Sequence, residues 1–134
     1  MAATWTARTN FAFTLAHKPG ALADFTEKVG RAGINLLGLW GYASGDEPPV
    51  FSCVPEDAGA FREFMSTLNM PADEGPCLHL EDDDRRGALV PWLREISEAG
   101  INLDAIETVA SSGRFGAFIW CAERDWPALK ALLT

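Results

Sequence analysis

The chain has 134 residues, a formal net charge of −8 and an apolar content of 48%, which is ordinary for a folded globular protein. The acidic balance argues against nucleic acid and anionic membrane surfaces as partners, because both carry negative charge. No apolar stretch approaches the length of a membrane-spanning helix, and the N-terminus lacks the pattern of a signal peptide. Three widely spaced cysteines, Cys53, Cys77 and Cys121, fit buried thiols better than a disulfide framework. We therefore expect a cytoplasmic protein.

The first half of the chain predicts a strand, a helix, two strands and a second helix. Large and small side chains alternate over residues 10–16, as in a strand. Apolar residues then recur at a spacing of three, four and three from Leu22 to Ala32, which places them on one face of a helix. Gly33 is positioned to end that helix in the left-handed conformation. The remaining elements are strands at 35–42 and 50–54, a helix with an apolar face at Phe61, Phe64, Met65 and Leu68, and a polar connector at 71–76.

The second half predicts the same order of elements. A strand is expected at 77–81, followed by a helix that begins near Ala88, because Pro91 is tolerated only in a first helical turn. Gly100 is placed to end that helix. The later elements are strands at 102–109 and 116–121, joined by a hairpin turn at 111–114, and a closing helix at 125–133.

An internal repeat explains why the two halves match. Gly33-Ile34-Asn35-Leu36 returns 67 positions later as Gly100-Ile101-Asn102-Leu103, and Gly20-Ala21-Leu22 returns at the same offset as Gly87-Ala88-Leu89. A fixed period of this kind indicates two copies of one structural unit. The same offset relates Phe51 to Phe118 and Glu56 to Glu123.

We therefore divide the chain into modules at 1–70 and 71–134. Each module reads strand-helix-strand-strand-helix, which is one strand short of a ferredoxin-like βαββαβ unit. Two arrangements are open at this point: one strand serves both units, or an open sheet edge pairs with a partner chain.

Two loops, at 17–20 and 84–87, are the best candidates for a binding site. Each follows a strand and opens a helix, and the first N–H groups of a helix attract an anion such as a carboxylate. The alternative is that each loop is a plain tight turn. Asn35 and Asn102 follow the two helix ends, and their amides could hold an ammonium group and a carboxylate together. Here the alternative is a capping asparagine.

These motifs resemble the ACT domain. The first copy is His17-Lys18-Pro19-Gly20-Ala21-Leu22 with Ala32-Gly33-Ile34-Asn35-Leu36, and the second is Asp84-Arg85-Arg86-Gly87-Ala88-Leu89 with Ala99-Gly100-Ile101-Asn102-Leu103. The family pattern has Asp or Asn before x-Pro-Gly; the first copy has His17 there, and the second has Asp84 but Arg86 in place of the proline. The resemblance covers nearly the whole chain, and it is strongest to stand-alone proteins made of two tandem ACT domains.

The resemblance implies a fold and a function. The implied fold class is α+β, with two tandem ferredoxin-like modules and an antiparallel sheet that carries four helices on one face. The implied function is that of a non-catalytic sensor that binds a small amino acid between modules without a cofactor and is read by another protein. Independently of the resemblance, we expect a homodimer or larger, because open sheet edges and surface-facing aromatics such as Trp40 would otherwise be exposed. The implied ligand-binding residues are His17, Pro19, Gly20, Ala21 and Leu22 facing Asn102, and Asp84, Arg86, Gly87, Ala88 and Leu89 facing Asn35. Asp84 would accept the ligand ammonium, and Arg85 or Arg86 would assist its carboxylate.

Other readings are weaker. Cys77 and His79 share a strand face and could ligate a metal, but no second pair has a metal-site spacing, so buried structural residues are favoured. Asp82-Asp83-Asp84 lacks the spaced ligands of a calcium loop. Trp40, Tyr42 and Trp120 could line a pocket or a dimer surface, with core packing favoured. Two alternative functions stay open: an assembly module that binds nothing, and a small enzyme of acylphosphatase type, which Arg85, Arg86 and Asn102 faintly resemble.

Overall fold

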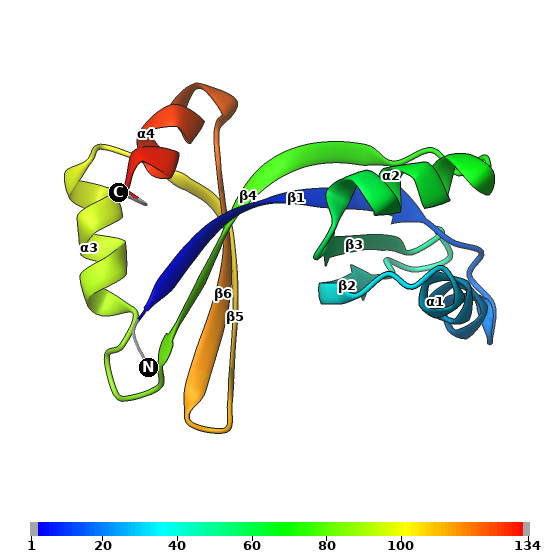
Figure 1. The fold of residues 1–134 in the computed structure, drawn as a ribbon, viewed down its shortest axis with the longest axis horizontal. Coiled ribbons are helices and arrows are strands. Elements are labelled where there is room, and N and C mark those ends of the chain that lie inside the picture. Colours follow the sequence, from blue (N-terminus) through cyan, green and yellow to red (C-terminus); the bar gives the residue numbers. More distant parts are fainter. Residues whose placement is uncertain (1–2, 133–134) are drawn as a thin grey trace. The chain divides into compact units, whose positions relative to one another are not determined.

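The computed structural model describes residues 3–132 and forms two compact units (Figure 1). The first unit is Arg8–Gly75. The second unit joins the described residues up to Ala7 to those from Pro76 onward. Compared with the predicted modules, residues 3–7 belong to the second unit instead of the first, and residues 71–75 belong to the first instead of the second. Each unit is described separately below.

The elements follow the predicted order through the chain. In the first half they are β1 (Thr4–Thr14), α1 (Ala21–Arg31), β2 (Leu36–Tyr42), β3 (Val50–Pro55) and α2 (Ala58–Thr67). In the second half they are β4 (Asp73–Asp83), α3 (Val90–Glu98), β5 (Leu103–Ser111), β6 (Arg114–Cys121), the short 3-10 helix Glu123–Asp125 and α4 (Trp126–Ala131). The predicted closing helix extended to residue 133, which lies outside the described residues. Among those residues, no helix has both the length and the apolarity that crossing a membrane requires.

The sheet has the strand order β2-β3-β1-β4-β6-β5. β3 is antiparallel to both β1 and β2, and β6 is antiparallel to both β4 and β5. The α+β class and the antiparallel ferredoxin-like plan predicted from the sequence are therefore confirmed.

Strands β1 and β4 are long, at 11 residues each, and both contribute to the two units. Residues 4–7 of β1 belong to the second unit, and Asp73–Gly75 of β4 belong to the first. Each unit thereby gains the fourth strand that its own half of the repeat lacks. Shared strands, one of the two arrangements left open by the sequence, are therefore present within the chain.

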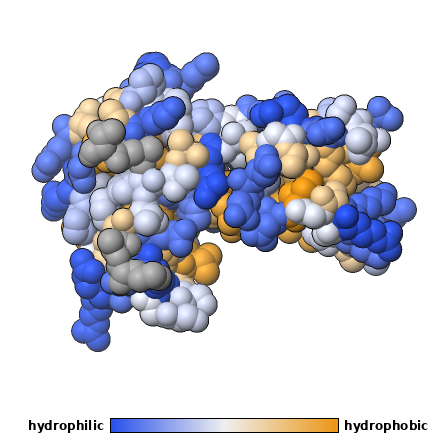
Figure 2. Space-filling view, viewed as in Figure 1, coloured by the Kyte–Doolittle hydropathy of each residue, from blue (hydrophilic) through white to orange (hydrophobic). Residues whose placement is uncertain are grey.

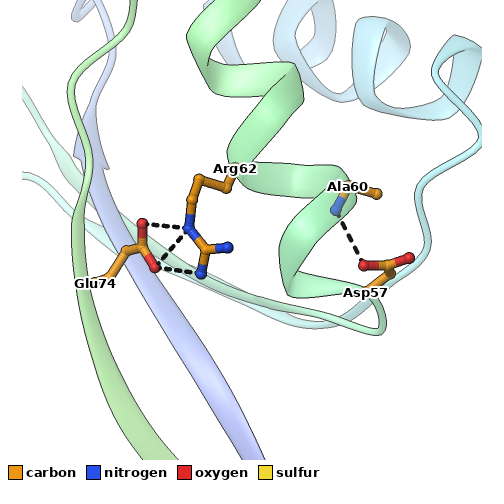
Figure 3. A network of polar contacts seen from close by, with 4 residues as sticks. All are labelled: Asp57, Ala60, Arg62 and Glu74. Carbon is orange, nitrogen blue, oxygen red and sulfur yellow. Dashed lines mark hydrogen bonds and ion pairs between the residues drawn. The ribbon is translucent and has the colours of Figure 1, made fainter.

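Two predicted strand starts were wrong for the same reason. β1 begins at Thr4 instead of residue 10, and β4 begins at Asp73 although 71–76 reads as a polar connector. Trp5 packs against the core of the second unit. Glu74 accepts a forked ion pair from Arg62 of α2, with N–O distances of 2.7–3.1 Å (Figure 3). Both segments are strands because of partners far along the chain, which local patterning does not reveal.

In the first unit, α1 and α2 pack on the same face of the strands. The core residues are Phe11, Phe13, Phe25, Val29, Cys53, Phe61 and Met65. Aromatic rings dominate this core, with ring centroids 4.8 Å apart for Phe11–Phe61 and for Phe13–Phe25. Complete burial of one such side chain contributes about 1.5–3 kcal/mol. Burial also raises the pKa of the Cys53 thiol to about 12, so this cysteine is a protonated core residue, as expected.

In the second unit, α3 and α4 pack on one face of β4, β5 and β6 (Figure 1). The fully buried side chains here include Leu78, Leu80, Ile96, Ile119 and Leu129. At the edge of this core, the rings of Trp5 and Trp92 meet edge to face with centroids 4.8 Å apart. Aromatic pairs in this geometry are favourable beyond their buried area.

The helix ends follow local rules. Gly33 and Gly100 have φ values of 73° and 76°, which confirms the predicted left-handed caps of α1 and α3. At the start of α2, the Ala60 N–H donates to Asp57 Oδ1 at 3.0 Å, as in Figure 3. Such side-chain caps stabilise a helix by about 1 kcal/mol.

The repeat offset changes by one residue at the hairpins. Phe13 pairs with Phe51, whereas Leu80, 67 positions after Phe13, pairs with Ala117, 66 positions after Phe51. The prediction that Phe118 is the equivalent of Phe51 is therefore wrong, because Ala117 occupies the structural position of Phe51. Neighbouring strand residues point to opposite faces, so Phe118 faces away from the core residue Ala117. It stacks on His79, with ring centroids 4.4 Å apart.

Candidate functional site

A cavity of about 480 Å³ lies beside the turn between β1 and α1, entirely within the first unit. The turn contributes residues 15–19, which include His17 and Pro19, together with Ala21 and Leu22. The β2–β3 hairpin contributes Gly41, Tyr42, Ala43, Pro49 and Phe51. Small-molecule sites have volumes of about 300–1,000 Å³, so this cavity is large enough for a metabolite.

The start of α1 adds backbone donors beside this cavity. Gly20 is the N-cap residue with φ of 87°, and no side chain caps the helix. The Asp24 N–H donates to the Gly20 carbonyl at 2.9 Å, which closes the first helical turn. The Ala21 N–H donates to the Lys18 carbonyl at 3.3 Å, within the turn. The N–H groups of Leu22 and Ala23 remain at the helix start, where the helix dipole favours an anion. Gly20 itself is not among the lining residues, so its contribution is the left-handed turn that aims the helix.

The lining of this cavity contains basic side chains and no carboxylate. Among its residues, His17 and Lys18 are the two that can carry charge, and both are exposed. The acidic residue of the first turn of α1, Asp24, is not part of the lining. The ammonium of Lys18 and the N–H groups of the helix start are therefore the groups here that can attract a carboxylate.

The corresponding turn of the second unit has a different geometry. Its cavity is about 220 Å³ and is lined by Asp84, Arg85, Gly87, Ala88, Leu89 and Val90 with three residues of the hairpin; Arg86 is not among them. The predicted helix start near Ala88 is wrong, because α3 begins at Val90. The Ala88 N–H donates to the Arg85 carbonyl and the Val90 N–H to the Gly87 carbonyl, both at 3.0 Å. The Ala88 bond matches the bond from the Ala21 N–H to the Lys18 carbonyl in the first turn, whereas the Val90 bond has no counterpart there. Ala88 itself is only 5% exposed.

The two asparagines do not line the cavities of their own units. Asn35 precedes β2, whereas the first cavity is lined by Gly41 and Tyr42 at the other end of that strand. The Asn35 amide donates to Glu56 Oε2 at 3.1 Å, and the Glu56 N–H donates to the Asn35 carbonyl at 2.9 Å. Asn102 is exposed and precedes β5. The pairing of each asparagine with the turn of the other module stays a prediction.

The weaker candidates have structural surroundings. Cys77 is fully buried, and His79 is 8% exposed against Phe118. Within residues 3–132, no group of three or more His, Cys, Asp or Glu side chains is placed to hold a metal ion. Asp82 accepts hydrogen bonds from the Asp83 N–H at 2.8 Å and from Trp92 Nε1 at 3.0 Å. The Asp83 N–H and then the Trp92 indole lower the pKa of Asp82, so this carboxylate helps to build the turn.

Sequence reasoning named only Tyr42 from the hairpin side of the first cavity. Its favoured placement in the core was wrong, because Tyr42 is 66% exposed. Residues 41–43 and 49–51 lie far along the chain from the turn at 15–22, and a pairing of strands brings them together. A glycine within a strand is the one local signal, because it often marks a close approach of another group. Gly41 is such a glycine.

No family model and no curated protein matches the sequence, but solved structures match nearly all of the chain. Protein BT0572 from Bacteroides thetaiotaomicron has a TM-score of 0.78 at 18% identity, over 96% of this chain and 90% of that one. The ligand-free regulatory subunit of aspartate kinase from Thermus thermophilus has a TM-score of 0.64 at 16% identity, over 98% and 95%. Aspartokinase III of E. coli in complex with lysine and aspartate has a TM-score of 0.54 at 14% identity, over 99% of this chain and 32% of that one. The chain therefore shares the fold of the aspartate kinase regulatory subunit. This agrees with the resemblance of its two turn motifs to the ACT domain.

Proposed function

We propose that this protein is a non-catalytic regulatory module that binds a free amino acid at the turn between β1 and α1. The cavity of about 480 Å³ beside the N-terminus of α1 carries the proposal. The shared fold supports it, because the similar chains include regulatory subunits of aspartate kinase and an aspartokinase in complex with lysine and aspartate.

The chemistry of the turn suits the carboxylate end of an amino acid. The N–H groups at the start of α1 are aligned with the helix dipole, and Lys18 adds a positive charge at the cavity lining. The apolar hairpin side of the cavity suits a side chain. The resemblance to the ACT family implies that an asparagine, Asn102, completes the site by meeting the ligand ammonium. That part of the proposal is tested by mutation below.

The mechanism would be a shift in population. A ligand that binds one arrangement of the modules better than another stabilises that arrangement by its difference in binding free energy. A protein that contacts this module then responds to the amino acid. The chain itself needs no catalytic group in this role.

A thermal-shift screen of the common amino acids tests the proposal. A ligand at 100 times its dissociation constant adds about 2.7 kcal/mol of stability, which raises the melting temperature by several degrees. Lys18→Ala should reduce the shift, because it removes a cation from the site. Arg85→Ala, at the equivalent position of the second turn, is the matched control and should leave the shift intact. No shift with any amino acid would contradict the proposal.

An assembly module without a ligand is the second candidate. The observation in its favour is exposed apolar surface on the first unit, where Tyr42 is 66% exposed and Val50 52% exposed. Figure 2 shows hydrophobic residues at the surface of this unit among hydrophilic ones. Oligomerisation without any thermal shift by amino acids would favour this function over sensing.

A further inference from the structure

The cavity of the first unit has an apolar wall that depends on one glycine. Gly41 of β2 pairs with Phe51 of β3. A Cβ atom on Gly41 would lie 2.2, 2.5 and 3.0 Å from three carbons of the Phe51 ring, which is closer than van der Waals contact allows. The ring can therefore lie across β2 only because residue 41 has no side chain. Both residues line the cavity.

The Phe51 ring is supported from the protein interior. It stacks on Phe13, with centroids 6.2 Å apart and an interplanar angle of 24°. Phe13 is 3% exposed and packs in turn on Phe25 of α1. Packed rings of this kind hold one orientation, so Phe51 presents a fixed apolar face to the cavity.

The second unit has the opposite arrangement at the same place. Thr108 pairs with Ala117 there, at the position that Gly41 and Phe51 occupy in the first unit. The larger side chain of the pair is on β3 in the first unit, whereas in the second unit it is Thr108 on β5, the equivalent of β2. The cavity of the second unit is about 220 Å³, compared with about 480 Å³ in the first. The Gly41–Phe51 pair thus distinguishes two cavities that the repeat would otherwise make alike.

We propose that the first cavity selects an amino acid with a large apolar side chain, and that Gly41 and Phe51 determine this specificity. The inference rests on the proposed function and names its ligand class. Around Phe51 the wall is completed by Leu15, Leu22, Ala43 and Pro49. The lining contains no carboxylate, so the ammonium of a lysine side chain would lose water without gaining an anionic partner. An amino acid with a carboxylate side chain would make no apolar contact with this wall.

Titration calorimetry on the full chain tests the ligand class. Leucine, isoleucine, methionine and phenylalanine form the apolar set, and lysine, aspartate, serine and glycine form the comparison set. A missing apolar group in such a pocket weakens binding by about 10–200-fold, so the best apolar ligand should bind at least about tenfold more tightly than serine or glycine. Tightest binding by lysine, aspartate or serine would overturn this inference and leave the proposed function standing. Binding by none of the eight would overturn this inference, and the thermal-shift screen of all the common amino acids would then decide the proposed function.

Gly41→Ala tests the specificity residues, because its methyl group must displace the Phe51 ring. We expect at least about a tenfold loss of affinity for the apolar set, in the range that a methylene-sized change produces. Gly75→Ala is the matched control, because Gly75 lies in β4 and a Cβ atom there would meet nothing within 4 Å. The Gly75→Ala protein should bind each amino acid with the affinity of the wild type. Unchanged affinities in a folded Gly41→Ala protein would overturn the assignment.

Phe51→Leu provides a second variant if Gly41→Ala does not fold. It keeps the core apolar and creates no clash with Gly41, but it removes the flat ring from the wall. We expect phenylalanine and methionine to lose more affinity than serine or glycine. Equal changes for all ligands would show that the ring does not select the side chain.

Discussion

The side-chain amide of Asn35 donates a hydrogen bond to the carboxylate of Glu56, with 3.1 Å between Nδ2 and Oε2. This bond joins the residue before β2 to the residue after β3. In the second unit Leu103 pairs with Cys121 as Leu36 pairs with Pro55, so Ala122 takes the place of Glu56. Asn102 therefore has no carboxylate at the position that engages Asn35. The two asparagines are equivalent in the repeat but not in their surroundings.

The first prediction separates these asparagines. Asn102→Ala should abolish most of the thermal shift caused by a bound amino acid, whereas Asn35→Ala should leave it, because the Asn35 amide is already engaged with Glu56. Both residues are exposed, so neither change should lower the ligand-free melting temperature by much. Differential scanning fluorimetry with and without ligand measures both quantities.

Two results would contradict that prediction in different ways. A loss of the shift in Asn35→Ala alone would place the working site at the second turn. An equal shift in the wild type and both variants would mean that neither asparagine contacts the ligand.

The second prediction concerns the caps of α1 and α3. Gly33→Ala and Gly100→Ala should each lower the free energy of unfolding by about 1 kcal/mol, because φ is positive at both positions. Gly30→Ala is the control: it lies inside α1, has no positive φ and meets nothing within 4 Å, so alanine there should stabilise the helix. Urea denaturation gives the three values. Equal unfolding midpoints for all three variants would show that backbone conformation is not what these glycines contribute.

The third prediction concerns the ion pair between Arg62 and Glu74 and its dependence on pH. The hydrogen bonds from Arg62 lower the pKa of Glu74 below its ordinary value of 4.5. A carboxyl whose folded-state pKa is lowered stabilises the protein above its unfolded pKa, and this is lost as the pH falls through the folded value. Glu74→Gln should therefore lower the urea midpoint at pH 7. The difference from wild type should shrink as the pH falls from 4.5 through the lowered folded-state pKa of Glu74, and it should vanish below that value.

A matched control is available in the exposed pair of Glu27 and Arg31 on α1. Glu27→Gln should change the midpoint less at pH 7, because a single exposed pair spaced four residues apart contributes little. A pH-independent difference between Glu74→Gln and wild type would show that the carboxylate charge is not what stabilises β4.

The fourth prediction concerns self-association. β2 and β5 are the edge strands of the sheet, and Val50 and Val109 expose 52% and 73% of their surface. Unpaired edges and exposed apolar side chains favour association. Light scattering at micromolar concentration should give the mass of a dimer or larger, and Val109→Lys, on the edge strand β5, should reduce it. A monomeric mass for the wild type would contradict the prediction.

The sequence by itself determined the order of the elements and several of the helix ends. These features depend on neighbours within a few residues: a glycine that adopts positive φ at positions 33 and 100, an aspartate that caps at 57, and a proline that is tolerated early in α3. The repeat also indicated the ferredoxin-like plan, because each copy carries the same local signals. The turn at 17–22 was predicted as a candidate site for the same reason.

Tertiary structure decided what depends on partners far along the chain. The long reach of β1 and β4, which gives each unit its fourth strand, follows from packing by Trp5 and from the ion pair of Glu74 with Arg62. The hairpins shift the register by one residue, and because strand side chains alternate, that shift turns Phe118 away from the core while Phe51 faces the cavity. Strand pairing alone places Gly41 under the Phe51 ring, and no local pattern contains that information.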